Sequence, residues 1–326
     1  MDRRSLMGWA AFALAGLPLR AAAAAAAATS QPEEPIPLWP AGPPGRDVLS
    51  LALQTEERST TPDVHDRLIS SIATPVITPI RPQTPDGSAI LIIPGGSYLF
   101  EAIDAEGLAP AAVFAAHGIT AFVLTYRLPA EGWTHRSNVP LEDAERAIRI
   151  IRARSHDYGI EPTRIGVMGF SAGGHVAASL ATKSAKTIYS PMDAIDGYDA
   201  RPSFAALLYP VITMLPPYAH EASRVRLLGV KTTTAIRTAY SVEHDVTDMT
   251  PPTFLCAAND DPDVPLDNSF MMFGSLRAAK VPAELHVFEK GGHGFGLGAP
   301  NEPVSQWPDL FLRWGASHSY FHNVTT

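Results

Sequence analysis

Cysteine is nearly absent from this chain: Cys256 is the only one among 326 residues. A single cysteine excludes an internal disulfide, and none lies near the N-terminus to carry a lipid anchor. Cys256 is part of an apolar Phe-Leu-Cys-Ala stretch, which favours a small buried hydrophobic residue over a nucleophile.

Several functional motifs are also missing. The histidines show no His-Glu-x-x-His or comparable ligand spacing, so we expect no metal site. No glycine-rich phosphate loop and no dinucleotide fingerprint is present, and we expect no cofactor. Charged residues make up only 18% of the chain, and the formal net charge of −8 is a poor match for nucleic acid.

The first 28 residues have the pattern of an export signal. Arg3 and Arg4 precede an apolar segment over residues 6–19, and eight consecutive alanines occupy 21–28. A charged start, an apolar middle and small residues before the cleavage site predict a signal peptide. The arginine pair followed by Ser-Leu-Met resembles a twin-arginine signal, with an ordinary Sec signal as the alternative. The apolar segment is short for a membrane anchor, so we expect a periplasmic or secreted protein.

The mature chain divides into an arm and one large domain. Residues 29–66 are expected to form an extended arm that buries Ile36, Leu38 and Trp39, with 48–66 polar and irregular. Residues 67–326 are the predicted catalytic domain. Its expected strands are 67–73, 75–81, 88–93, 119–126, 165–168, 204–211, 253–257 and 283–288, and helices are expected between most of them.

This alternation predicts an α/β fold with a doubly wound, mostly parallel sheet and helices on both faces. The first two strands are expected at the sheet edge because of Pro75 and Pro79. Amphipathic helices are expected at 141–158 and about 303–318. Residues 212–250 have no strand pattern and are interpreted as an insertion.

The most informative stretch is Gly169-Phe170-Ser171-Ala172-Gly173. An apolar strand precedes this G-x-S-x-G pattern, and small helix-forming residues follow it. Such a strand–turn–helix places the serine at the tip of a nucleophile elbow. The glycines allow the sharp turn without a Cβ clash. A glycine-rich turn without catalytic function is the alternative.

A nucleophilic serine needs a base, and a carboxylate that orients this base. His293 is the candidate base because it lies in a Gly-Gly-His-Gly loop after the last predicted strand. His175 begins the helix behind the serine, where we do not expect it to reach the hydroxyl. For the acid we favour Asp261, at the end of the preceding strand, and Asp260 and Asp263 in the same loop remain alternatives.

Amide donors are needed to stabilise the oxyanion of a tetrahedral intermediate. The residue after the nucleophile, Ala172, supplies one predicted donor. Gly96 and Ser97 supply the other, because they follow the strand at 88–93 in a Pro-Gly-Gly-Ser turn. The alternative is a tight glycine turn with no role in catalysis.

With these residues assembled, the chain resembles the α/β-hydrolase superfamily, whose triads follow the order serine, acid, histidine. More narrowly, it resembles secreted bacterial esterases of the acetylxylan esterase-like (BD-FAE-type) group. The likeness begins at Ile36-Pro-Leu-Trp-Pro and continues through Ile93-Pro-Gly-Gly-Ser-Tyr98, Phe122-Val-Leu-Thr-Tyr-Arg-Leu-Pro129 and Gly166-Val-Met-Gly-Phe-Ser-Ala-Gly-Gly-His175. It ends at Ala283-Glu-Leu-His-Val-Phe-Glu-Lys-Gly-Gly-His-Gly-Phe-Gly296. Related lipases and esterases carry His-Gly-Gly-Gly where this chain has Pro-Gly-Gly-Ser.

The resemblance implies a serine carboxylesterase that hydrolyses short acyl esters, above all acetyl esters of carbohydrates such as xylan. In that case Trp133, on the loop 127–140, is expected to stack against a sugar ring, or alternatively to fill the loop against the core. Tyr98 is expected to bound a short acyl pocket or to pack the turn. No stable membrane anchor and no nucleic-acid partner are expected.

Other functions compatible with the same motifs are a lipase or feruloyl esterase and a peptidase of the prolyl-oligopeptidase type. Such peptidases usually carry a large N-terminal propeller. Only about 55 residues separate the predicted signal from the first core strand, which leaves no room for one. A non-catalytic binding protein on this fold typically lacks a triad member, whereas this sequence keeps all three.

Overall fold

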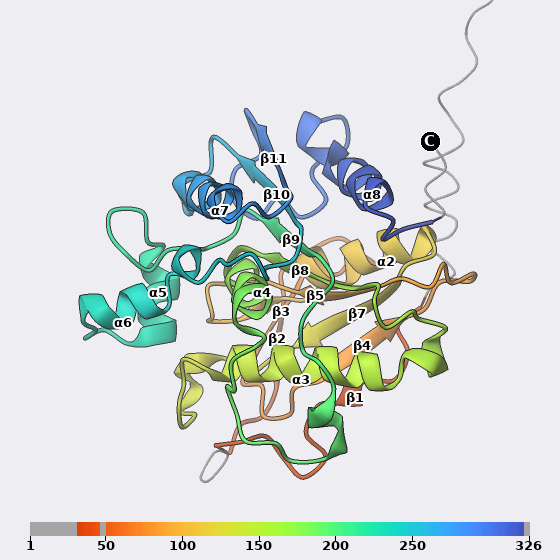
Figure 1. Cartoon of the computed structure of the whole chain (residues 1–326), viewed down its shortest axis with the longest axis horizontal. Coiled ribbons are helices and arrows are strands. Elements are labelled where there is room, and N and C mark those ends of the chain that lie inside the picture. The colour runs from red at the N-terminus through yellow and green to blue at the C-terminus, as the bar shows by residue number, and fades with distance from the viewer. Residues whose placement is uncertain (1–30, 46–49, 323–326) are drawn as a thin grey trace, which may run out of the picture.

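The computed structural model describes residues 31–45 and 50–322, so the predicted signal peptide lies outside the described residues. An eight-stranded sheet forms the centre, in the spatial order β1-β4-β7-β5-β8-β9-β10-β11 (Figure 1). In chain order, its strands are β1 (Ile36–Pro37), β4 (Val76–Ile80), β5 (Ala89–Ile93), β7 (Thr120–Thr125), β8 (Ile165–Phe170), β9 (Ala205–Leu208), β10 (Thr253–Ala258) and β11 (Ala283–Phe288).

The sheet is mostly parallel, as the sequence predicts. Strand β4 runs antiparallel to both of its neighbours, and the strands from β7 to β11 run parallel to one another. Strands β5, β7, β8 and β10 are buried along their whole length. A strand covered on both faces has no solvent side, which explains their nearly continuous apolar sequences.

Helices cover both faces of the sheet, as expected for a doubly wound fold (Figure 1). Helices α3, α4 and α7 pack on one face, and α2 and α8 pack on the other. The helices are α2 (Ala109–Ala116), α3 (Val139–Ala153), α4 (Ser171–Lys183), α5 (Glu221–Leu228), α6 (Thr234–Ala239), α7 (Asp267–Ala278) and α8 (Trp307–Ser317). Short turns add η1 (Asp104–Leu108), η2 (Pro129–Glu131), η3 (Ser155–Tyr158), η4 (Ala194–Gly197), η5 (Val242–His244) and η6 (Pro303–Gln306).

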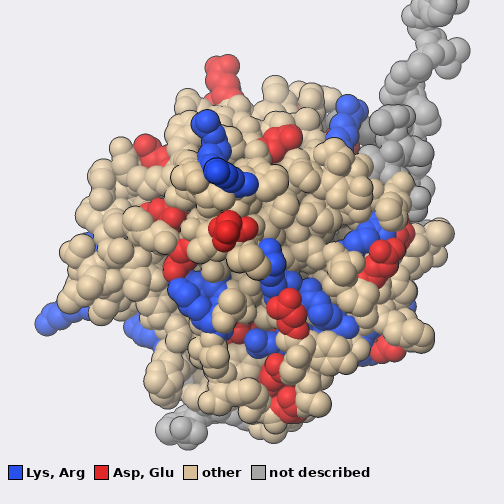
Figure 2. Space-filling view, in the orientation of Figure 1, with Lys and Arg blue, Asp and Glu red and all other residues tan. Residues whose placement is uncertain are grey.

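Helix α3 shows how apolar spacing selects the buried face. Ala144, Ile148 and Ile151 recur at helical spacing and are completely buried. Across the region of α3, basic and acidic side chains lie intermixed on the surface (Figure 2). The α-helix ends earlier than predicted, and the remaining residues form η3, which Gly159 terminates with a φ of +63°.

The N-terminal part differs in detail from the expected edge strands. Strand β3 (Arg67–Ser70) does not join the main sheet but pairs with β2 (Gln54–Glu57) and β6 (Glu101–Ala102) in a separate three-stranded sheet. Strand β4 is not the edge, because β1 pairs with its outer side. The prediction of an irregular 48–66 is wrong at β2, whose residues are all exposed and therefore show no apolar alternation.

The arm reaches the core through Leu38 and Trp39, whereas Ile36, also expected to be buried, is only partly buried. Leu38 is fully buried and Trp39 is 4% exposed. The indole Nε1 of Trp39 donates to Asp143 Oδ1 on α3 at 2.7 Å, and its ring meets Tyr189 edge-on at 5.0 Å. The arm is thus fixed by a buried hydrogen bond to α3 and by aromatic packing against Tyr189.

The segment 212–250 contains α5, α6 and η5 and no strand, as predicted. Strand β9 is shorter than predicted and ends at Leu208, because Tyr209 adopts a φ of +36° and Pro210 follows it. None of the helices in the described part of the chain is long and apolar enough to cross a bilayer.

Candidate active site

The serine lies at the junction of β8 and α4. Ser171 has a φ of +50°, a strained value for a residue with a side chain, and it begins α4. The flanking glycines are needed for close approach: a Cβ at Gly169 would lie 2.2 Å from the carbonyl oxygen of Gly173. A Cβ at Gly173 would lie 2.2 Å from the carbonyl oxygen of Ile93. Strand, turn and helix therefore form the predicted elbow.

The structure brings Ser171, His293 and Asp261 together. Ser171 Oγ lies 2.8 Å from His293 Nε2, and His293 Nδ1 lies 2.7 Å from Asp261 Oδ2. The parallel neighbours β10 and β11 place the loops that carry Asp261 and His293 side by side at the carboxyl edge of the sheet. Because a carboxylate accepts, His293 donates through Nδ1 and presents an unprotonated Nε2 to the hydroxyl.

Both carboxylate oxygens of Asp261 are engaged. Oδ2 accepts from His293, and Oδ1 accepts from the amides of Asp263 and Val264, each at 2.9 Å. Only 2% of its side chain is exposed. Asp263 is exposed, and its side chain makes no hydrogen bond to His293. Of the three candidate acids, Asp261 is therefore the one that contacts the histidine.

Asp260 has a different place in the same loop. Its Oδ1 accepts from the amides of Gly291 and Gly292, at 2.9 and 2.8 Å. These glycines immediately precede His293, and Gly292 has a φ of +64°. Asp260 therefore fixes the path of the histidine loop rather than the histidine ring.

The carboxylates determine the electrostatics of His293. Burial alone lowers the pKa of this histidine, but the hydrogen bond and charge of Asp261 raise it, and the charges of Glu106 and Asp263 add to that effect. The net result is a pKa above the ordinary value. A more basic histidine is a better acceptor for the serine proton, and its protonated form is stabilised in the transition state.

The predicted oxyanion donors lie in two segments, the turn after β5 and the start of α4. Gly96 and Ser97 have φ values of +137° and +58°, and a Cβ at Gly96 would lie 2.1 Å from the carbonyl oxygen of Phe100. Among the hydrogen bonds of the described residues, the amides of Gly96, Ser97 and Ala172 donate to no protein oxygen. Ala172 lies in the first turn of α4, where amides have no partner within the helix. These amides are therefore free to donate to an oxyanion.

Comparison with known proteins identifies the family. A family profile described as the α/β hydrolase fold matches residues 90–297. The chain belongs to the α/β-hydrolase family. Its resemblance to acetylxylan esterase-like enzymes, predicted from the motifs, is confirmed by its relatives.

This α/β-hydrolase is 34% identical over 221 residues to an acetylxylan esterase of Xylanibacter ruminicola. It is 37% identical over 218 residues to endo-1,4-beta-xylanase B of Butyrivibrio fibrisolvens. Each match covers 67% of this chain but only 43% and 34% of the respective relative, so the chain spans less than half of their length.

A solved structure matches over a larger share. The acetyl ester-xyloside bifunctional hydrolase from Caldicellulosiruptor lactoaceticus superposes with a TM-score of 0.73 at 33% sequence identity. The match covers 89% of this chain and 97% of that one. The shared architecture therefore extends beyond the central sheet to most of the described α/β-hydrolase.

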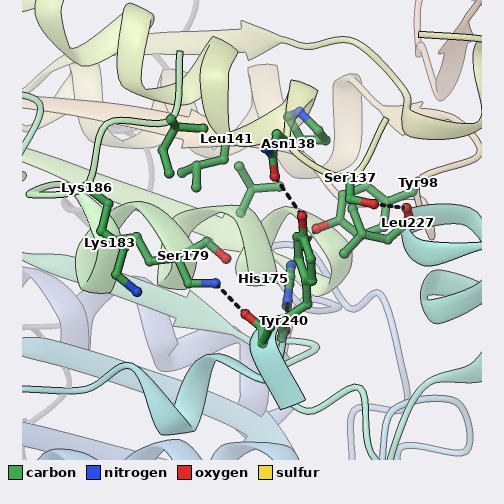
Figure 3. A pocket seen from close by; sticks show the side chains of 14 residues that line it. Tyr98, Ser137, Asn138, Leu141, His175, Ser179, Lys183, Lys186, Leu227 and Tyr240 are labelled. Carbon is green, nitrogen blue, oxygen red and sulfur yellow. Dashed lines mark hydrogen bonds between the residues drawn. The ribbon is translucent and has the colours of Figure 1, made fainter. Parts of the chain in front are cut away.

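Tyr98 follows the turn that carries the predicted oxyanion donors Gly96 and Ser97, and it is buried. Its hydroxyl bonds to His175 Nδ1 at 2.7 Å, and His175 Nε2 contacts the carbonyl oxygen of Tyr240 at 2.8 Å (Figure 3). Since a carbonyl only accepts, His175 donates through Nε2 and Tyr98 donates to Nδ1. These residues line a cavity of about 230 Å³ between α3, α4 and the end of α6. Tyr98 thus packs the turn, and its role in an acyl pocket stays a prediction.

The geometry also explains why His175 does not act as the base. Both of its ring nitrogens have partners other than Ser171. Burial lowers the pKa of His175 to about 4, so the ring stays neutral near pH 7. The expectation that His175 does not serve the hydroxyl agrees with these contacts.

The prediction of Trp133 as an exposed sugar platform is wrong. Trp133 is only 5% exposed, and the guanidinium of Arg127 lies over its ring at 5.1 Å. Arg127 is itself fully buried and paired with Glu142 and Asp143. The indole of Trp133 packs over the buried Arg127 guanidinium and makes a cation–π contact with it, which holds the loop against the core. Trp133 therefore fills the loop against the core, the alternative interpretation.

Three residues near the site were not found from the sequence: Glu106, Tyr209 and His220. Glu106 is a buried carboxyl in η1, and Tyr209 lies just after β9. His220 precedes α5, and its ring centroid lies 6.4 Å from that of His293. These residues come close to the site because segments far apart in the sequence meet in the fold, and no local sequence motif predicts that contact.

Proposed function

We propose that this α/β-hydrolase is a secreted serine carboxylesterase that removes short acyl groups, acetyl above all, from carbohydrates such as xylan. The observation that carries the proposal is the continuous relay from Ser171 Oγ through His293 to Asp261, with contacts of 2.8 and 2.7 Å. The names of its relatives, an acetylxylan esterase and an acetyl ester-xyloside hydrolase, support the substrate class.

The proposed reaction has two halves. Ser171 Oγ attacks the ester carbonyl while His293 Nε2 takes its proton, and Asp261 keeps the ring in the required tautomer. The amides of Gly96 or Ser97 and of Ala172 stabilise the oxyanion. His293 then protonates the leaving alcohol, which leaves an acyl group on Ser171. Water, activated by His293, releases the acid in the second half.

An activity screen tests the substrate class. The purified mature protein is assayed on nitrophenyl acetate, butyrate and octanoate, and on acetylated and feruloylated xylan. We expect the highest kcat/KM for acetate, together with acetate release from acetylated xylan. One added methylene changes discrimination by about 1–3 kcal/mol, so the preference should be graded. A preference for octanoate without acetate release from xylan would indicate a lipase and overturn the proposal.

The same screen covers the peptidase alternative. Peptide amides are included as substrates, and we expect no cleavage of them at enzyme concentrations that exhaust nitrophenyl acetate. Cleavage of a peptide amide with a kcat/KM above that for the acetyl esters would identify a peptidase of the prolyl-oligopeptidase type. Ferulate release in excess of acetate release would indicate a feruloyl esterase.

We also propose that the chain is exported by the twin-arginine route. Support comes from the sequence alone, because Arg3 and Arg4 precede an apolar segment and a run of alanines. Replacement of both arginines by lysine should block this route and leave Sec export largely intact. Normal periplasmic accumulation of the Lys-Lys variant would contradict the twin-arginine route but not export itself.

A further inference from the structure

Glu106 is a buried carboxyl that touches the oxyanion loop. It lies in η1 and is 5% exposed. Its Oε2 accepts from the amide of Gly95 at 2.7 Å, and its Oε1 accepts from the hydroxyl of Tyr209 at 2.9 Å. Gly95 immediately precedes the predicted donors, and a Cβ at Gly95 would lie 2.8 Å from Ser171 Cβ. The carboxyl therefore fixes the backbone of the turn directly beside the nucleophile.

Tyr209 continues this connection to the histidine loop. Its hydroxyl oxygen accepts from the amide of Gly296 at 3.1 Å, and its ring meets the His293 ring edge-on with centroids 5.2 Å apart. The ring of Phe295 packs against it at 4.3 Å. The carbonyl of Gly296 is held in turn by Trp307 Nε1 at 2.8 Å. Tyr209 and Trp307 thus hold the loop that carries His293 through the backbone of Gly296.

We propose that Glu106 is a positioning residue that couples the oxyanion loop to the histidine loop through Tyr209. The inference rests on the proposed function, since it assigns a role within the same reaction. One side chain connects both halves of the site. It accepts from the amide of Gly95, next to the predicted donors, and through Tyr209 it reaches the loop that carries His293. A displacement of about 1 Å at either half costs up to about 100-fold in rate, so a shared anchor matters for kcat.

The partners of Glu106 fit its ionised form, because both donate a hydrogen to it. Burial raises the pKa of Glu106 above its ordinary value, and the hydrogen bonds from Tyr209 and Gly95 and the charge of His293 offset only part of that rise. The ionised carboxylate adds to the negative field around His293. Other charged or titratable groups that face His293 are Asp261 and Asp263 from the loop after β10 and His220 before α5.

His293 carries a positive charge in the proposed transition state. The charge of Glu106 stabilises the imidazolium together with Asp261, although only Asp261 touches the ring. Loss of this charge lowers the pKa of His293. A purely structural carboxyl would change the folded fraction but would leave this pKa in place.

The test compares Glu106→Gln with a matched control. Glutamine keeps the volume and removes the charge. Glu131→Gln is the control, because Glu131 is a half-buried carboxyl that also accepts from backbone amides, those of Ser71 and Ile72. The substrate is nitrophenyl acetate, and kcat, KM, the pH profile of kcat/KM and the melting temperature are measured. Tyr209→Phe is a second variant, which keeps the ring on His293 and removes the hydroxyl.

We expect Glu106→Gln to lower kcat by about 10-fold or more with KM nearly unchanged, because the anchor acts on geometry at the reacting atoms. The acidic limb of its kcat/KM profile should move to lower pH. Tyr209→Phe should also lower kcat, and Glu131→Gln should keep both kcat and the acidic limb of the parent enzyme.

Wild-type kcat and an unshifted acidic limb in folded Glu106→Gln would overturn the proposal. So would an equal loss of activity in Glu131→Gln. If Glu106→Gln does not fold, Tyr209→Phe decides, and wild-type kcat in that variant is the contradicting result. Ser171→Ala is run in parallel: activity there would contradict the proposed function, whereas an inactive Ser171→Ala beside a normal Glu106→Gln contradicts only this inference.

Discussion

Two histidines lie close to Ser171, one on the loop after β11 and one on α4, and their surroundings are opposite. His293 has Asp261 on Nδ1 and the charge of Glu106 nearby, and its pKa is raised. His175 has a hydroxyl and a carbonyl as partners and no carboxylate contact, and burial lowers its pKa to about 4. The first ring can accept a proton, whereas the second joins loops as a neutral hydrogen-bonding group.

The difference shows that burial by itself does not make a histidine a base. Both rings are desolvated, and desolvation disfavours the charged form of each. Only the carboxylates around His293 reverse that effect. In the proposed mechanism the site separates two tasks: the loops after β10 and β11 supply proton transfer, and the Tyr98–His175 contact behind the turn at residues 94–97 supplies rigidity.

The largest expected effect comes from the same substitution at both positions. His293→Asn should lower kcat by about 10⁴-fold or more, because it removes the base. His175→Asn should lower kcat by less than about 100-fold, because it only loosens the support of Tyr98. Steady-state kinetics on nitrophenyl acetate measure both. Equal losses in the two variants would erase the distinction between base and support.

The carboxylate that distinguishes the two histidines can be removed. Asp261→Asn should lower kcat by about 10⁴-fold, since the wrong tautomer of His293 becomes favoured. Asp260→Asn should cost about 10-fold at most, because Asp260 holds only the backbone of Gly291 and Gly292. Asp263→Asn should leave kcat nearly unchanged, because the Asp263 side chain makes no hydrogen bond to His293. A larger loss in Asp260→Asn or Asp263→Asn than in Asp261→Asn would reassign the acid.

The free energy of unfolding should fall in acid because His175 is buried as a neutral ring. Its folded pKa of about 4 lies below the ordinary value of 6.5, so the unfolded chain binds a proton first as the pH falls. Stability from this group is fully present above pH 6.5 and is lost progressively between pH 6.5 and 4, by up to about 3 kcal/mol. Denaturant unfolding of wild type and His175→Gln across this range should show a shallower loss in the variant. Parallel curves would contradict the neutral buried ring.

The smallest expected effect concerns the turn that His175 supports. Ser97 has a φ of +58°, which glycine adopts without strain. Ser97→Gly keeps the amide donor and should stabilise the fold by up to about 1 kcal/mol, less the entropy that glycine adds to the unfolded chain. Thermal unfolding measures this change, and activity should be retained. A large loss of activity would show that the Ser97 side chain itself takes part in the reaction.

The sequence predicted the parts of the site that depend on local rules. Gly169 and Gly173 surround a serine between an apolar run and small residues, and that pattern is typical of one sharp turn. The order of Ser171, Asp261 and His293, after β8, β10 and β11, then limits where their side chains meet. Parallel strands bring their carboxyl ends to one edge, so the contact needs no detailed packing information.

Other features depend on partners far away in the sequence. Glu106 and Tyr209 are 103 positions apart, and neither residue type signals the other. Trp133 could face solvent or core, and the choice is made by the buried pairing of Arg127 with Asp143. The strand β2 has only exposed residues, so its existence depends on backbone pairing with β3 rather than on an apolar pattern.

The acyl-enzyme itself tests the central claim most directly. Wild-type protein is mixed with nitrophenyl acetate, quenched within the first turnovers, digested and analysed by mass spectrometry, beside Ser171→Ala. We predict one acetyl group on the peptide that contains Ser171, and a loss of turnover by several orders of magnitude in folded Ser171→Ala. An acetyl group on another residue, or near-normal turnover of Ser171→Ala, would contradict the account.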